Sequence, residues 1–92
     1  MKKYKVIYPQ SYIKRAAKFF KRHPDLIQQY RKTLEILEIN PHHPSLRLHP
    51  LKGKLNGLHS VSINISYRLT LELIIGPREI VLINIGSHEE VY

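Results

Sequence analysis

The sequence predicts an α+β protein in which a helical hairpin packs on one face of a mainly antiparallel sheet. Residues 11–39 place apolar side chains at helical spacing, with an interruption at Pro24. Residues 60–73 alternate between polar and apolar side chains, which is typical of strands with one buried face. A length of 92 residues suits a single domain, 1–92, with one core. The expected order of elements is β-α-α-β-β-β.

A short strand and a cationic helix are expected first. Residues 4–8 alternate in character ahead of Pro9, and Lys5 is expected to face outward. Ser11 is expected to cap a helix that ends before Pro24, because a serine side chain can accept a hydrogen bond from the first helical turn. The apolar residues of this helix recur at helical spacing: Tyr12, Ala16, Phe19 and Phe20.

A second helix is expected after Pro24 and Asp25, ending before Asn40 and Pro41. Its apolar stripe consists of Leu26, Ile27, Tyr30, Leu34, Leu37 and Ile39. The two helices are expected to form an antiparallel hairpin.

Three strands should follow a polar loop at 41–44. The alternating stretch 60–73 reads as two antiparallel strands joined by a tight turn at 64–66, and a further turn at 76–79 leads to the last strand. That strand, 80–85, is apolar on both faces, as expected of a central strand. The sheet face away from the helices is expected to be a shallow polar surface carrying Ser60, Ser62, Arg68, Thr70 and His88.

The chain is strongly basic, with 15 Lys and Arg against 7 Asp and Glu, a formal net charge of +8 and a pI near 9.9. Such a charge favours polyanionic partners: nucleic acid, an anionic membrane surface or an acidic protein. Residues 1–22 contain eight Lys and Arg and no acidic residue, and a second basic group lies mid-chain.

Composition also excludes several classes of protein. There is no cysteine, so neither a disulfide framework nor a thiolate zinc site can form. No apolar run approaches the roughly 20 residues of a membrane span, and no signal peptide is recognised. We therefore expect a cytoplasmic protein without a membrane partner.

Three short segments resemble one known family. They are His49-Pro50-Leu51-Lys52-Gly53-Lys54-Leu55-Asn56-Gly57, then Tyr67-Arg68-Leu69, and finally Gly86-Ser87-His88 with Tyr92 four residues later. Together with the length, basicity and element order, they resemble the RelE/ParE toxin superfamily, nearest its YafQ-like branch.

The resemblance implies the toxin of a type II toxin–antitoxin system with a RelE-like fold. Such a toxin is a ribosome-dependent endoribonuclease (an mRNA interferase) that cuts mRNA in the ribosomal A site. It uses no metal and no cofactor, and a cognate acidic antitoxin inhibits it. The free toxin is expected to be a monomer.

RNA cleavage without a metal needs a base for the 2′-hydroxyl, a cation for the phosphorane and an acid for the 5′-oxygen. We assign His88 as the acid, because an imidazole moves protons near neutral pH. The base is either His49 or Lys54. Arg68 is assigned as a bidentate phosphate clamp, with its structural alternative an ion pair to Glu72 or Glu90.

Further side chains are expected to contact RNA. Tyr92 can stack on a base, or pack on the core instead. The cationic contacts with RNA are expected from Arg47, Lys52, Lys14, Arg15, Lys18 and Lys21, although the four on the first helix could equally form a solvated face. His49 could instead only cap its loop. The remaining histidines, expected to be solvated, are His23, His42, His43 and His59.

The chain departs from the family pattern at three positions. The YafQ-like branch has a second histidine and an aspartate where this chain has Ser62 and Ser66, and the YoeB-like branch has a glutamate at the position of Lys54. Two alternatives therefore remain: a ParE-like inhibitor of DNA gyrase, which would generally lack His88, and a non-catalytic family member that binds antitoxin.

Overall fold

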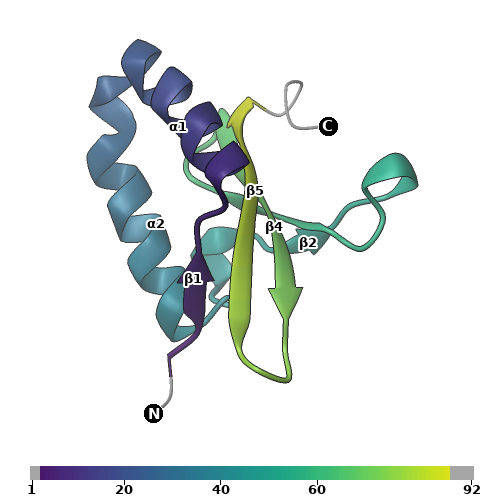
Figure 1. Ribbon diagram of the computed structural model, residues 1–92. Helices are drawn as coiled ribbons and strands as arrows, with labels where there is room; N and C mark the ends of the chain where they lie inside the picture. The colour runs from purple at the N-terminus through teal and green to yellow at the C-terminus, as the bar shows by residue number, and fades with distance from the viewer. Residues whose placement is uncertain (1–2, 88–92) are drawn as a thin grey trace.

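The α+β architecture is confirmed by the structure, a computed structural model that describes residues 3–87. Two helices, α1 (Gln10–Arg22) and α2 (Ile27–Ile39), form a hairpin beside a curved sheet (Figure 1). The sheet order is β1-β5-β4-β3-β2, with β1 parallel to β5 and the other pairs antiparallel. Its strands are β1 (Lys5–Ile7), β2 (His49–Pro50), β3 (His59–Ser62), β4 (Tyr67–Ile74) and β5 (Glu79–Ser87).

Strand β2 is an addition to the expected element order. It is only two residues long and pairs His49 with Ser60 and Pro50 with His59. The pairing continues in the backbone, where Leu51 N–H donates to the Leu58 carbonyl at 2.9 Å. This short strand attaches the 49–57 segment to the sheet.

The expected helix boundaries need one correction. Helix α1 begins at Gln10, and Pro9, rather than Ser11, occupies the capping position. Pro9 has φ −60° and ψ 153°, an extended conformation that proline favours and that can precede a helix. Ser11 therefore lies inside the first turn, and no side chain caps this helix.

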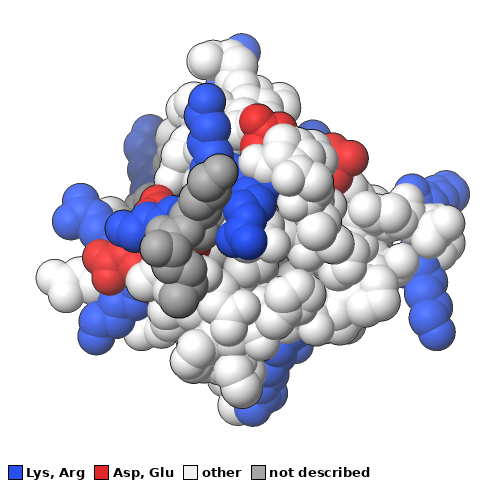
Figure 2. Space-filling view, turned by 90° about the horizontal axis from the view of Figure 1, so that it is seen from below, with Lys and Arg blue, Asp and Glu red and all other residues white. Residues whose placement is uncertain are grey.

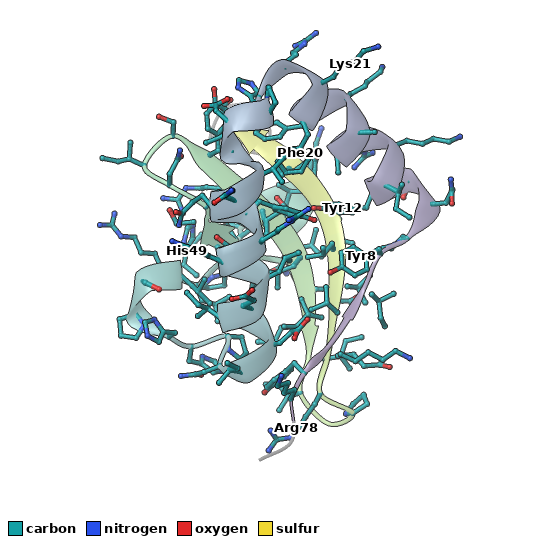
Figure 3. The ribbon with its side chains drawn as sticks, turned by 90° about the vertical axis from the view of Figure 1, so that its left-hand side faces the viewer. Tyr8, Tyr12, Phe20, Lys21, His49 and Arg78 are labelled. Carbon is teal, nitrogen blue, oxygen red and sulfur yellow. The ribbon has the colours of Figure 1, made fainter. Side chains whose placement is uncertain are left out.

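The core lies between the helices and one face of the sheet. Tyr12 of α1 and Leu37 of α2 are fully buried there, and Figure 3 shows Tyr12 and Phe20 directed into this layer. The hydroxyl oxygens of Tyr12 and Tyr30 lie 2.8 Å apart and share a hydrogen bond that ties α1 to α2. Burial, followed by this hydrogen bond, raises the pKa of Tyr12 far above its ordinary 10.0.

The apolar stripe of α2 differs from the expectation at two positions. Ile39 was expected in the core but is 55% exposed. It lies two residues beyond the buried Leu37, which is about 200° around the helix. Thr33 is buried instead, and its hydroxyl donates to the Gln29 carbonyl at 2.9 Å, which satisfies the polar group within the helix.

The turns of the sheet lie where the sequence predicts them. In the turn between β3 and β4, the Asn64 side-chain oxygen accepts from the backbone N–H groups of Ser66 and Tyr67, both at 2.9 Å. Ile65 at its tip is 93% exposed. The turn from β4 to β5 contains Arg78 at φ 57°. Strand β5 lies between β1 and β4, as its two apolar faces predict.

Within residues 3–87, no helix is long and apolar enough to span a membrane. Lys and Arg side chains project from the molecule in several directions, and acidic side chains are fewer (Figure 2).

Candidate functional site

The sheet face away from the helices carries two rows of polar side chains. Ser62 pairs with Arg68, and Arg68 pairs with Gly86. One row along, His49 pairs with Ser60, which pairs with Thr70. Directly paired residues point to the same face of a sheet, so His49 and Arg68 share this face. They are separated by two strand spacings across the sheet and by two residues along it, about 12 Å in all.

The middle of this face is not the open polar surface that the sequence predicts. Ser60 and Thr70 are 0% and 1% exposed, and neither hydroxyl has a hydrogen-bond partner within residues 3–87. By alternation Leu51 lies on the same face and is itself buried. The centre of the face is therefore a covered floor, and the accessible polar groups lie around it.

His49 is half-buried at the edge of this floor. Its Nδ1 atom lies 3.1 Å from the Arg47 carbonyl oxygen. A histidine whose Nδ1–H donates to a carbonyl presents Nε2 as its proton acceptor. The geometry thus suits the base role expected from the sequence, although the same contact also steadies the loop.

A hollow of about 410 Å³ lies beside His49, and we call it the lysine hollow. It is lined by His49, Pro50, Leu51, Lys52, Lys54 and Leu55. Gly53, at φ 68°, allows the chain to turn between the two exposed lysines, because this left-handed conformation suits glycine. The structure therefore places His49, Lys52 and Lys54, the candidate catalytic and RNA-binding residues of the 49–57 segment, around one hollow.

Arg68 is half-buried on β4 and forms no ion pair with Glu72, one of the two structural partners considered from the sequence. Its Nη1 atom is buried without a hydrogen-bond partner among residues 3–87, and Glu72 is exposed. A guanidinium with an unpaired N–H group can donate hydrogen bonds to an oxyanion. Glu90, the other expected partner, lies outside the described residues, as do His88 and Tyr92.

The cations of α1 line a separate hollow on the helical side, with a volume of about 480 Å³. Its lining consists of Arg15, Lys18, Phe19, Lys21, Arg22, His23 and Ile85, whereas Lys14 does not contribute. Arg15 also donates from Nη1 to the Ile83 carbonyl at 3.1 Å. Ile83 has no partner in the register between β4 and β5, at an irregularity next to Thr70 and Leu71.

Two of the four histidines expected to be solvated, His23 and His59, are half-buried instead. His23 packs against Phe19 and Tyr67, with ring centroids 4.6 and 4.8 Å apart. His43 Nδ1 accepts from Ser45 N–H at 3.1 Å, and His59 is half-buried. The expectation was wrong for His23 and His59, because single-residue reasoning cannot see tertiary neighbours; His42 and His43 are exposed as expected.

A third hollow, of about 240 Å³, was not expected from the sequence. Its lining comes from two segments, with Ser45 and Arg47 from one and Ser62, Ile63, Asn64 and Ile65 from the other. We call it the turn hollow. Arg47, by its charge, and Ser62, on the expected polar sheet face, were singled out in the sequence. Their meeting was not expected, because the hollow forms only where the β3–β4 turn meets the loop before β2. No group of three or more His, Asp or Glu in the described part of the chain could hold a metal ion.

Comparisons of the sequence found no matching family model and no matching curated protein. Comparisons of the structure found several toxins. A YafQ variant from E. coli superposes with a TM-score of 0.77 at 21% identity, over 97% of this chain and 98% of that one. YafQ in its complex with DinJ gives 0.77 at 20% identity, with 97% of each chain covered.

A further similar structure is a YoeB/ParE toxin from Agrobacterium tumefaciens, with a TM-score of 0.72 at 18% identity, covering 91% of this chain and 98% of that one. Each comparison includes almost the whole of both chains, so the likeness extends to the complete arrangement of helices and strands. The chain therefore has the fold of the YafQ and YoeB/ParE toxin structures.

Proposed function

We propose that this protein is the toxin of a toxin–antitoxin pair and acts as a ribosome-dependent endoribonuclease. The observation that carries the proposal is the common sheet face of His49 and Arg68, bordered by the lysine hollow, in a chain with the fold of YafQ. A proton acceptor, a guanidinium and two lysines are the groups that RNA cleavage without a metal uses.

In the proposed reaction, His49 or Lys54 removes the proton from the 2′-hydroxyl, and the resulting oxygen attacks the neighbouring phosphorus. Arg68 binds the non-bridging oxygens as their charge grows, with Lys52 in support. His88 protonates the departing 5′-oxygen. The P–O5′ bond breaks, and the products are a 2′,3′-cyclic phosphate and a 5′-hydroxyl end.

The positive charge of the chain also favours binding of an acidic protein partner. The complex of YafQ with DinJ motivates a cognate antitoxin for this chain, and a net charge of +8 favours an acidic one. The exposed lysines of α1 are proposed to contact ribosomal RNA.

One observation favours a second candidate, a non-catalytic protein that binds antitoxin. Ser62 stands where YafQ-like toxins carry a histidine, and its hydroxyl donates to the Asn64 carbonyl at 2.7 Å. This hydroxyl is engaged in the turn and cannot replace an imidazole as a base.

Primer extension on a reporter mRNA after induction of the protein tests the proposal. A ribosome-dependent nuclease produces new 5′ ends in phase with codons, and only when the reporter is translated. A gyrase inhibitor would change plasmid supercoiling without new mRNA ends. A non-catalytic protein would produce neither effect.

A further inference from the structure

We propose that the turn hollow is a subsite for the nucleotide adjacent to the cleaved phosphate in single-stranded RNA. The proposal rests on the function proposed above and names the residues that would determine nucleotide preference. The turn hollow borders the candidate site at two points. The Arg47 carbonyl oxygen lies 3.1 Å from His49 Nδ1, and Ser62 pairs directly with Arg68.

The lining of the turn hollow has the chemistry of a nucleotide site. Arg47 supplies a guanidinium, and no acidic side chain lies in the lining. Asn64 uses its side-chain oxygen for the backbone of the turn, so its amide Nδ2 remains as the hydrogen-bond donor toward a ligand. A guanidinium beside an amide donor suits phosphate oxygens and the acceptor atoms of a base.

Ile65 adds an apolar surface at the rim. It is 93% exposed at the tip of a turn, where a polar residue would be less costly to hydrate. Apolar side chains pack against the faces of unstacked bases in nucleic-acid sites. Ile65 is therefore suited to contact a base whose phosphate binds Arg47.

The backbone of Arg47 supports a role for its side chain. Arg47 has φ 50° and ψ 46°, a left-handed conformation that is costly for residues other than glycine. Its side chain is exposed and forms no hydrogen bond or ion pair within residues 3–87. Arg78 also has a positive φ, but its guanidinium lies 5.6 Å from the centroid of the Tyr4 ring. The contact with Tyr4 gives Arg78 a structural role. The Arg47 side chain has no comparable contact within residues 3–87, so no structural role accounts for an arginine at this strained position.

Two matched pairs of variants test the subsite by binding alone. The probe is a fluorescein-labelled RNA hexamer with 2′-O-methyl groups, which cannot be cleaved, and fluorescence anisotropy measures its Kd. Arg47→Gly is compared with Arg78→Gly, since both remove one charge at a positive φ. Ile65→Ala is compared with Ile75→Ala, since both isoleucines are exposed in turns. Arg78 is a suitable control because it lies at one end of the molecule, opposite Lys21 and away from His49 of the candidate site (Figure 3).

We expect Arg47→Gly to weaken binding about tenfold and to lower the salt slope by about 0.7, the share of one phosphate contact in single-stranded RNA. Its thermal stability should not fall, because glycine relieves the left-handed strain. Ile65→Ala should reduce differences in Kd among A, C, G and U hexamers. Arg78→Gly should change the Kd of the hexamer by less than about twofold. Ile75→Ala should change the differences in Kd among the four hexamers by less than about twofold.

Equal losses within each matched pair would overturn the subsite, because they would show that only overall charge or exposed apolar area matters. The hexamer is not cleaved, so this result is independent of nuclease activity. Failure of the wild type to cut mRNA would therefore contradict the proposed function without altering the measured contribution of Arg47 and Ile65 to RNA binding.

Discussion

Ser62 on β3 lies directly opposite Arg68 on β4, and the two side chains differ in how they are engaged. The Ser62 hydroxyl donates to the Asn64 carbonyl, whereas the buried Nη1 of Arg68 has no partner within residues 3–87. One position of the pair therefore stabilises the turn, and the other retains a donor for a ligand. This difference leads to the first two predictions.

Replacing Arg68 by lysine should slow mRNA cleavage by at least about tenfold. Lysine keeps the charge but loses the planar fork that binds two phosphate oxygens at once. The rate is measured by single-turnover cleavage of ribosome-bound mRNA, with Arg31→Lys on the exposed side of α2 as the control. An unchanged rate in Arg68→Lys, with intact folding, would exclude the clamp role.

Introducing a histidine at position 62 should accelerate cleavage. Ser62→His supplies a second imidazole one strand away from Arg68, at the position where YafQ-like toxins have one, and a well-placed base contributes about 10²–10⁴-fold. Ser62→Gln is the matched control, since it has similar size but does not titrate. If both variants change the rate equally, the missing histidine does not limit catalysis.

Alkaline pH should destabilise the fold through Tyr12. Burial raises the pKa of this phenol in the folded protein above its ordinary 10.0, so the folded state holds the proton that the unfolded chain releases. Stability is therefore full below pH 10 and declines as the pH rises above it, by about 1.4 kcal/mol per pH unit for each such group. Urea unfolding at pH 9 and pH 11 should show a smaller decline in Tyr12→Phe, and equal declines would contradict this account.

The core should be sensitive at Leu37 and tolerant at Ile39. Leu37→Ala removes a fully buried side chain between α2 and the sheet and should lower the free energy of unfolding by about 2–5 kcal/mol. Ile39→Ala, at the exposed end of the same helix, should cost less than about 1 kcal/mol. Chemical denaturation measures both, and similar losses would contradict the burial of this helix face.

Periodicity was sufficient to predict the helices, the turns and the central position of β5, because each depends on local spacing of apolar side chains. Strand β2 escaped prediction because two residues are too few to show a period. The buried state of Ser60 and Thr70 escaped it as well, since alternation assigns a face but not what covers that face.

The candidate site was predictable only where its residues are neighbours in the sequence. The segment around His49 and Lys52 carries its chemistry in adjacent residues, so these candidates could be named from the sequence, whereas the hollow beside them is a finding of the structure. The turn hollow combines Arg47 with Ile65, which are far enough apart in the chain that only the folded sheet reveals their proximity. His23 was likewise assigned to solvent because its contact with Tyr67 is tertiary.

The central claim is tested most directly with purified protein added to a reconstituted translation reaction, followed by mapping of mRNA ends. The wild type should cut translated mRNA and leave a 2′,3′-cyclic phosphate or 3′-phosphate. His88→Ala should cut about 10²–10⁴-fold more slowly, the usual contribution of general acid catalysis. His42→Ala, at an exposed histidine, should cut normally. Cleavage by His88→Ala at the wild-type rate, or no cleavage by the wild type at all, would contradict the account.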